Sequence, residues 1–162
     1  MRTAEELERK LWKALKADRT LMLWLESEAG HPRPMTALLE AEGHGPAWIF
    51  TSADNPLAER ARTAVRACAS FASMGHDLFA SLQGVLLRDD DRTAIDRLWN
   101  PFTAAWYEGG KDDPKLALLR FEPAHAEIWS NENSLWAGMK VLLGADPKKE
   151  YQDHVADVDL RH

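Results

Sequence analysis

The sequence contains very little cysteine, because Cys68 is the single cysteine among 162 residues. One cysteine excludes an intrachain disulfide and argues against a zinc site built from thiolates. Cys68 lies in the apolar segment 67–71, where we expect a buried strand. We therefore expect a small core side chain at this position.

The sequence also lacks an excess of positive charge. It has 20 lysines and arginines against 26 aspartates and glutamates, which gives a formal net charge of −6. Proteins that bind the phosphate backbone of nucleic acids concentrate basic residues on one face. This balance of charge argues against a nucleic-acid partner.

No stretch of the sequence is apolar over the roughly 20 residues that a helix needs to cross a bilayer. The first ten residues, MRTAEELERK, are too charged and too acidic for a secretory signal. We therefore expect a cytoplasmic protein that has no membrane partner.

Common catalytic motifs are absent as well. The sequence contains no HExxH, GxSxG or P-loop motif and no dinucleotide-binding glycine fingerprint. Its six histidines form no metal-binding pattern. The acidic run 89–91 is better explained as the start of a helix, where carboxylates are favourable, than as a cation site. We expect no metal, and no general acid or base is evident.

The sequence does contain enough apolar residues, 45%, for one globular domain. Thr3 and Glu6 form a capping box, and the apolar spacing that follows predicts an amphipathic helix over residues 4–17. We predict a single domain over residues 1–145. The polar, patternless segment 146–162 is expected to form a loosely ordered tail.

Strand patterns dominate the rest of the chain. The expected strands cover residues 21–27, 33–42, 47–52, 67–74 and 79–88, and Lys115–Ser130 is expected to form a strand pair or one bent strand. The first three should form an antiparallel meander, and Pro123 should lie at an edge or a bulge. Short helices are expected over 56–66 and from the acidic run through residue 107. The predicted fold class is α+β, mainly β: a small antiparallel barrel with helices at its openings.

One strand end has the features of a phosphate site. Thr51 and Ser52 end an aromatic strand, and Asn55 and Pro56 are typical of a helix N-cap and first helical residue. Free backbone amides at a helix N-terminus can hold a phosphate. Taken alone, however, the two hydroxyls are ordinary strand-end residues.

The order of motifs along the chain is more specific than any one of them. Arg33-Pro34-Met35, then Phe50-Thr51-Ser52, then a segment from Trp99 to Trp106 precede the turn GGKDDP at 109–114. This ordered set resembles the FMN-binding split-barrel proteins related to pyridoxamine 5′-phosphate oxidase, and among them the general stress protein 26 group. The resemblance spans roughly residues 5 to 143.

The resemblance implies an antiparallel split barrel that binds FMN, or FAD, in a homodimer with its sites at the interface. It implies that Arg33, Thr51 and Ser52 contact the phosphate, and that backbone groups of Met35 and Thr36 line the ring. The candidate flavin-binding residues are Arg33, Pro34, Met35, Thr36, Phe50, Thr51, Ser52, Asn55, Leu57, Trp106 and Tyr107.

Three positions depart from the family pattern, one of them Glu108, which stands where the group often has proline. Asn55 stands where many relatives carry serine, and Leu57 stands where many carry a phosphate-binding lysine. Loss of that ammonium group predicts FMN binding that is weakened or lost.

The tryptophans allow two interpretations. Trp99 and Trp106 are seven residues apart and should face the same side of a continuous helical segment. They can anchor a core or a dimer interface, or they can approach the ring, for which Trp106 and Tyr107 are the better candidates.

Three functions remain open from the sequence. The chain can be a flavin-dependent oxidoreductase of unknown substrate, or a flavin-binding protein without turnover that serves in stress, storage or sensing. Alternatively it can be a flavin-free split-barrel dimer that binds another ligand or acts as an interaction module. The leucine at position 57 favours the last.

Overall fold

The computed structural model describes residues 3–27, 31–40, 43–131, 142–144 and 155–161. Strands dominate these ranges, and all the strand pairs in them are antiparallel. In chain order the elements are α1 (Ala4–Asp18), β1 (Thr20–Leu25), β2 (Arg33–Thr36), β3 (Leu38–Leu39), β4 (Ala47–Ser52), α2 (Pro56–Arg60), β5 (Val65–Ala72), β6 (Leu78–Arg88), α3 (Arg92–Leu98), α4 (Pro101–Ala104), the 3-10 helix η1 (Gly110–Asp112), β7 (Leu116–Ser130) and β8 (Val155–Asp159).

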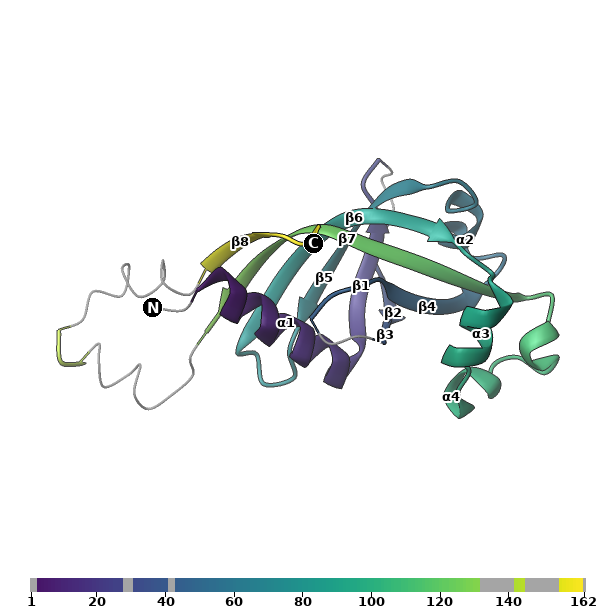
Figure 1. Cartoon of the computed structure of the whole chain (residues 1–162), viewed down its shortest axis with the longest axis horizontal. Helices are drawn as coiled ribbons and strands as arrows, with labels where there is room; N and C mark the ends of the chain where they lie inside the picture. The colour runs from purple at the N-terminus through teal and green to yellow at the C-terminus, as the bar shows by residue number, and fades with distance from the viewer. Residues whose placement is uncertain (1–2, 28–30, 41–42, 132–141, 145–154, 162) are drawn as a thin grey trace.

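The sheet closes almost completely on itself. Its strand order is β2-β1-β5-β6-β7-β4-β3, and β8 also pairs with β7. The two outermost strands, β2 and β3, follow one another in the chain with only Ala37 between them. The two edges of the sheet therefore meet, as expected for an antiparallel split barrel with a few helices. Figure 1 shows β6 and β7 running across the molecule, with α3 and α4 at one end.

The predicted meander is wrong in one respect. Residues 33–39 do not form one strand between two neighbours, because the segment divides into β2, which pairs with β1, and β3, which pairs with β4. The backbone N–H of Ala37 bonds to the carbonyl of Arg19, which extends the β1–β2 register by one position beyond Thr20↔Thr36 before the chain turns to pair with β4. This break is the point at which the barrel closes.

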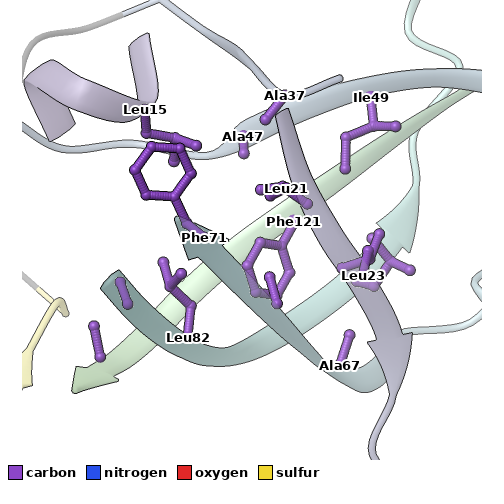
Figure 2. Packing of buried hydrophobic residues seen from close by; sticks show 14 of the residues in the cluster. Leu15, Leu21, Leu23, Ala37, Ala47, Ile49, Ala67, Phe71, Leu82 and Phe121 are labelled. Carbon is purple, nitrogen blue, oxygen red and sulfur yellow. The ribbon is translucent and has the colours of Figure 1, made fainter. Parts of the chain in front are cut away.

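The barrel interior is apolar. Alternate residues along β7, Ala117, Leu119 and Phe121, point into the main core, as the two-residue period of a strand requires. Figure 2 shows Phe121, Leu21 and Leu23 gathered inside the barrel, with Leu15 of α1 beside Phe71 of β5. Cys68 is buried on β5, which confirms the expectation of a small core side chain.

Helix α1 forms as the capping box predicts. The hydroxyl of Thr3 accepts from the backbone N–H of Glu6, and the Glu6 carboxylate accepts from the backbone N–H of Thr3. Leu7, Leu11 and Leu15, each four residues apart, place one face of the helix against the core. The helix thereby helps to fill the interior of the barrel.

A bulge interrupts the long β6–β7 pair at the expected proline. Gln83 pairs with His125 and Gly84 with Pro123, so Ala124 is an extra residue on β7. A Cβ atom on Gly84 would lie 2.0 Å from the backbone oxygen of Glu122. Only glycine fits at this close approach.

Two other predicted boundaries differ from the structure. The helix expected over 56–66 ends at Arg60, and residues 61–63 form a turn. The predicted loose tail contains β8, which pairs with β7 from Val155↔Trp129 to Asp159↔His125. Residues 146–154 of that tail lie outside the described ranges. No helix in the ranges that the structure describes combines the length and the apolar content required to cross a bilayer.

Candidate functional site

A cavity of about 540 Å³ lies at the place where the barrel closes. It is bounded by the end of α1, by β2 and β4, and by the α4 segment. The residues that line it are Ala17, Asp18, Arg19, Thr20, Thr36, Leu38, Phe50, Asn100, Phe102, Thr103, Trp106 and Tyr107. Four of these, Thr36, Phe50, Trp106 and Tyr107, are candidate residues from the sequence.

Strands β2 and β4 form one side of this region and contact one another. Strand β3 pairs Leu38 with Trp48, so β2, which precedes β3 in the chain, lies beside the C-terminal half of β4. Side chains of alternate residues share a face. A line of candidate residues therefore runs from the cavity toward the N-terminal end of β2.

Arg33, at the start of β2, and Ser52, at the end of β4, lie beyond the cavity. Along β2, Arg33 alternates with Pro34 and so lies on the face of Met35. The side chains of Arg33 and Ser52 are both exposed, and they do not line the cavity itself. Within the described part of the chain, the side chain of Arg33 makes no hydrogen bond or ion pair. Met35, by contrast, is half-buried and packs against the main core. Arg33 is thus a cation that is available to an anionic ligand.

The tryptophans do not share one helical face as predicted. Helix α3 ends before Trp99, and α4 starts anew with Asn100 as its N-cap and Pro101 as its first residue. The Asn100 side chain accepts from the backbone N–H of Thr103 at 3.0 Å. The Asn-Pro pair is itself a helix-start signal, and it could have revealed this break in the sequence.

The break gives the two tryptophans different environments. Trp99 is half-buried and packs edge-on against Phe50, with ring centroids 5.9 Å apart. Trp106 is 84% exposed at the cavity. Phe102, four residues earlier, is 80% exposed there. The cavity therefore has a half-buried aromatic wall and two exposed aromatic side chains beside it.

Tyr107 is the buried polar residue of the cavity, with an exposure of 9%. Burial raises the pKa of its phenol above the usual value, and the nearby carboxylates of Asp113 and Asp54 act in the same direction. A side-chain hydrogen bond with Ser52 opposes this shift. This bond connects the cavity to the exposed end of β4.

The expected phosphate helix differs from the prediction in its details. The Oδ1 of Asn55 accepts from the backbone N–H of Leu57 at 2.9 Å, so Asn55 is the N-cap as predicted. The Nδ2 of Asn55 lies 3.2 Å from the Thr51 hydroxyl, to which it donates. Thr51 is buried, and Leu57 is 5% exposed and packs in the main core. The side chains of Thr51 and Leu57 are thus turned into the protein.

Several cavity residues carried no clear signal in the sequence. Asp18, Arg19 and Thr20 come from the turn between α1 and β1. Arg19 has a φ of 65°, a conformation that a glycine commonly marks at the end of a helix. Without a glycine the tight turn, and its position beside Thr36, could not be identified from sequence alone.

Metal chemistry finds no support in this part of the molecule. Among the residues placed by the structure, no cluster of three or more His, Cys, Asp and Glu side chains could hold a metal ion. The cavity is instead lined by aromatic rings, hydroxyl groups and one residue of each charge. Such a lining suits a flat organic ligand that carries polar groups.

Comparison with known families identifies a close sequence relationship. The family model described as pyridoxamine 5′-phosphate oxidase like matches residues 6–152. No match was found among curated proteins.

Solved structures give the same result. The chain is 58% identical to the general stress FMN/FAD binding protein from the phytopathogen Xanthomonas citri, with 87% of this chain and 100% of that chain covered and a TM-score of 0.77. A general stress family protein from Xanthomonas campestris pv. campestris is also 58% identical, with coverage of 89% and 100% and a TM-score of 0.77. A general stress protein 26 from Jannaschia sp. CCS1 is 29% identical, with coverage of 95% and 98% and a TM-score of 0.75. These similarities confirm the resemblance inferred from the ordered motifs.

Proposed function

Because the chain belongs to the pyridoxamine 5′-phosphate oxidase-like family, we propose that it binds a flavin in the cavity between β2, β4 and α4. The observation that carries the proposal is the convergence of Thr36, Phe50, Trp106 and Tyr107 on one cavity. These four residues come from three separate segments of the chain. A relative at 58% identity is an FMN/FAD binding protein, which supports the same ligand class here.

The residues of the site fit such a ligand. A cavity of about 540 Å³ is within the usual range for small-molecule sites, roughly 300–1,000 Å³. Phe50 and Trp106 offer aromatic surface for a planar ring system. Arg33, exposed and without an ion pair in the described part of the chain, offers a charge-assisted contact for a phosphate.

We propose that Arg33 of β2 and Ser52 of β4 anchor the flavin phosphate, beside Pro34, the neighbour of Arg33 on β2. Thr51 and Asn55 bond to each other and support this end of β4 from behind. Leu57 lies in the core and supplies no charge. A charged hydrogen bond is worth about 1.5–3 kcal/mol, so loss of the family lysine should weaken binding by roughly 10-fold to more than 100-fold.

When bound, the flavin would supply electron-transfer chemistry. The residues of this chain would hold and orient it: Met35 and Thr36 through backbone groups at the ring, and Tyr107 through its bond to Ser52. On this basis we propose an FMN-dependent protein of the general stress type. Its candidate activity is oxidoreduction of an unknown substrate.

We further propose a cytoplasmic homodimer. Trp106 and Phe102 are 84% and 80% exposed beside the cavity. Large aromatic side chains left in water at a ligand site are commonly covered by a partner. A second copy of the chain would bury them and complete the wall around the ring.

One observation favours a second candidate, a flavin-free dimer that binds another ligand. The amide of Leu57 at the start of α2 is already bonded to the Asn55 side chain, and the Leu57 side chain is buried. The proposed phosphate end of the site therefore has fewer hydrogen-bond donors for a phosphate than the family pattern implies.

FMN titration of the dialysed full-length protein, followed by quenching of tryptophan fluorescence, tests the proposal. We expect saturable binding at one FMN per chain, with riboflavin weaker because it lacks the phosphate. FAD titrated in parallel shows whether the site prefers FMN. No FMN binding at high concentration would favour the flavin-free candidate.

Arg33→Ala tests the anchor. We expect FMN affinity to fall by roughly 10-fold to more than 100-fold, because the cation proposed to meet the phosphate is removed. Arg161→Ala is the matched control, because Arg161 is exposed and bonds to Asp159, next to the end of β8. Equal FMN affinity in wild type and Arg33→Ala would remove Arg33 from the site.

A further inference from the structure

A second cavity, of about 680 Å³, lies along the surface of α1. Its lining residues are Arg9, Trp12, Lys13, Lys16, Ala17 and Gly43, and we call it the α1 groove. Ala17 also lines the proposed flavin cavity. The two cavities are therefore neighbours at the C-terminal end of the helix.

The α1 groove is basic in a protein of net charge −6. Arg9, Lys13 and Lys16 are spaced by four and three residues, so they lie along one face of the helix. At about 1.5 Å per residue, their attachment points span roughly 10 Å. No carboxylate-bearing side chain is among the described residues that line the groove.

Two of these cations, Arg9 and Lys13, differ from the third. Over the ranges placed by the structure, their side chains form no hydrogen bond or ion pair. The carboxylate of Glu8, on the same helix, is buried and accepts from the indole N–H of Trp12 at 3.4 Å. The exposed charges of Arg9 and Lys13 are therefore not neutralised by this neighbour.

This arrangement fits a ligand that carries more than one anionic group. A single phosphate could meet only part of a row of cations that spans roughly 10 Å, whereas a dinucleotide carries a diphosphate with a ring at each end. An extended ligand along the groove would reach Ala17 and the turn at Asp18 and Arg19. That turn lines the proposed flavin cavity at the end away from Arg33.

We infer that the α1 groove binds the phosphates of a nicotinamide dinucleotide whose nicotinamide ring enters the flavin cavity. This inference rests on the proposed function, because it takes the ligand of the cavity between β2, β4 and α4 to be a flavin. In this arrangement Arg9 and Lys13 contact the phosphates of the dinucleotide, whereas Arg33 contacts the phosphate of the flavin. The protein would then hold its electron donor and its flavin in adjoining cavities.

Calorimetric titration of the full-length protein with ADP, NADP⁺ and inorganic pyrophosphate tests the inference. The test variant is Arg9→Gln/Lys13→Gln, in which both unpaired cations become neutral amides. The matched control is Lys10→Gln, because Lys10 is on the same helix but donates to the Ser130 hydroxyl at 3.0 Å. FMN is titrated against all three proteins.

We expect wild type to bind ADP and NADP⁺ saturably and more tightly than pyrophosphate. The double variant should lose about 10-fold or more in affinity for both nucleotides, while Lys10→Gln stays within about two-fold. FMN affinity should be the same in all three. Raised salt should weaken nucleotide binding in wild type more than in the double variant.

Three results would overturn the inference: no saturable ADP binding to wild type, equal ADP affinity in wild type and the double variant, or pyrophosphate binding as tight as NADP⁺. Failure of the proposed function is distinguishable, because it appears as absent FMN binding while ADP still binds and responds to the double variant.

Discussion

The β6–β7 pair and the β2–β3 segment differ in the length and continuity of their strand pairing. Strands β6 and β7 pair over a register that runs from Leu78↔Ser130 to Arg88↔Leu119, interrupted once by a bulge. The β2–β3 segment contains strands of four and two residues that pair with different neighbours. The first region builds the wall of the barrel, and the second leaves the place where it closes.

The burial of side chains follows this difference. Leu78, Ala80 and Leu82 on β6 are buried almost completely, at the two-residue spacing of alternate strand positions. On β2, Arg33, Pro34 and Thr36 are exposed. Long paired strands bury the side chains of one face in the packed core. A short, broken edge leaves more side chains exposed, where they can contact a ligand. The candidate site lies at the broken edge for that reason.

The largest expected contrast between the two regions comes from a pair of aromatic truncations. Phe121→Ala removes a fully buried ring from the wall, and we expect a loss of about 3–5 kcal/mol in the free energy of unfolding. Trp106→Ala removes a ring that is exposed on the single chain and should change the stability of the monomer by no more than about 0.5 kcal/mol, while FMN affinity falls. Urea unfolding and FMN titration measure the two effects. A large loss of stability in monomeric Trp106→Ala would contradict the distinction between wall and site.

The bulge offers a second test within the wall. In Gly84→Ala the added Cβ would meet the Glu122 carbonyl oxygen at 2.0 Å, and the next two atoms, both at 2.8 Å, are also backbone. Because backbone cannot rotate away, we expect a loss of about 2–4 kcal/mol in unfolding free energy. Gly75→Ala is a suitable control, since its nearest neighbour there would be a side-chain atom of Asp77 at 3.6 Å. Equal stability of the two variants would contradict the assigned constraint at Gly84.

The smallest expected effect concerns Tyr107, where the site meets the packed interior. Burial raises the pKa of its phenol in the folded state, so the neutral form is favoured there. Its contribution to stability is present at pH values below the unfolded pKa of about 10. That contribution is lost as the pH rises from this value through the higher folded pKa.

The difference in phenolate absorbance between wild type and Tyr107→Phe follows this titration. The chain has two tyrosines, and the second, Tyr151, contributes equally to both proteins. We expect the difference curve to have its midpoint above about 10. A midpoint at or below that value would show that the phenol is not buried in solution.

Much of the fold could be predicted because its signals are local. The capping box of Thr3 and Glu6 gave the correct start of α1, and Pro123 marked the bulge. Short runs of aromatic, β-branched and other apolar residues identified the strands around Ile49, Leu82 and Leu119. Each of these signals depends on residues a few positions apart.

Predictions that needed contacts between distant residues were less successful. The sequence gives no sign that Ala37 separates two strands with different partners, because the alternation of residues says nothing about which edge a strand joins. The segment 155–159 lacks a strong strand pattern and becomes a strand because β7 offers it an open edge. For the candidate site, the four residues around the cavity were predicted, whereas Asp18 and Arg19 were not.

The sequence by itself determined most of the helices and strands and the family motifs, because helix caps, turn residues and apolar runs act over short distances. Only the tertiary structure decided that Leu57 turns into the core, that Trp99 and Trp106 separate, and that the ends of the sheet meet beside α4. Those outcomes depend on which surfaces pack together when the barrel closes, and this competition among long-range contacts is not encoded in any single segment.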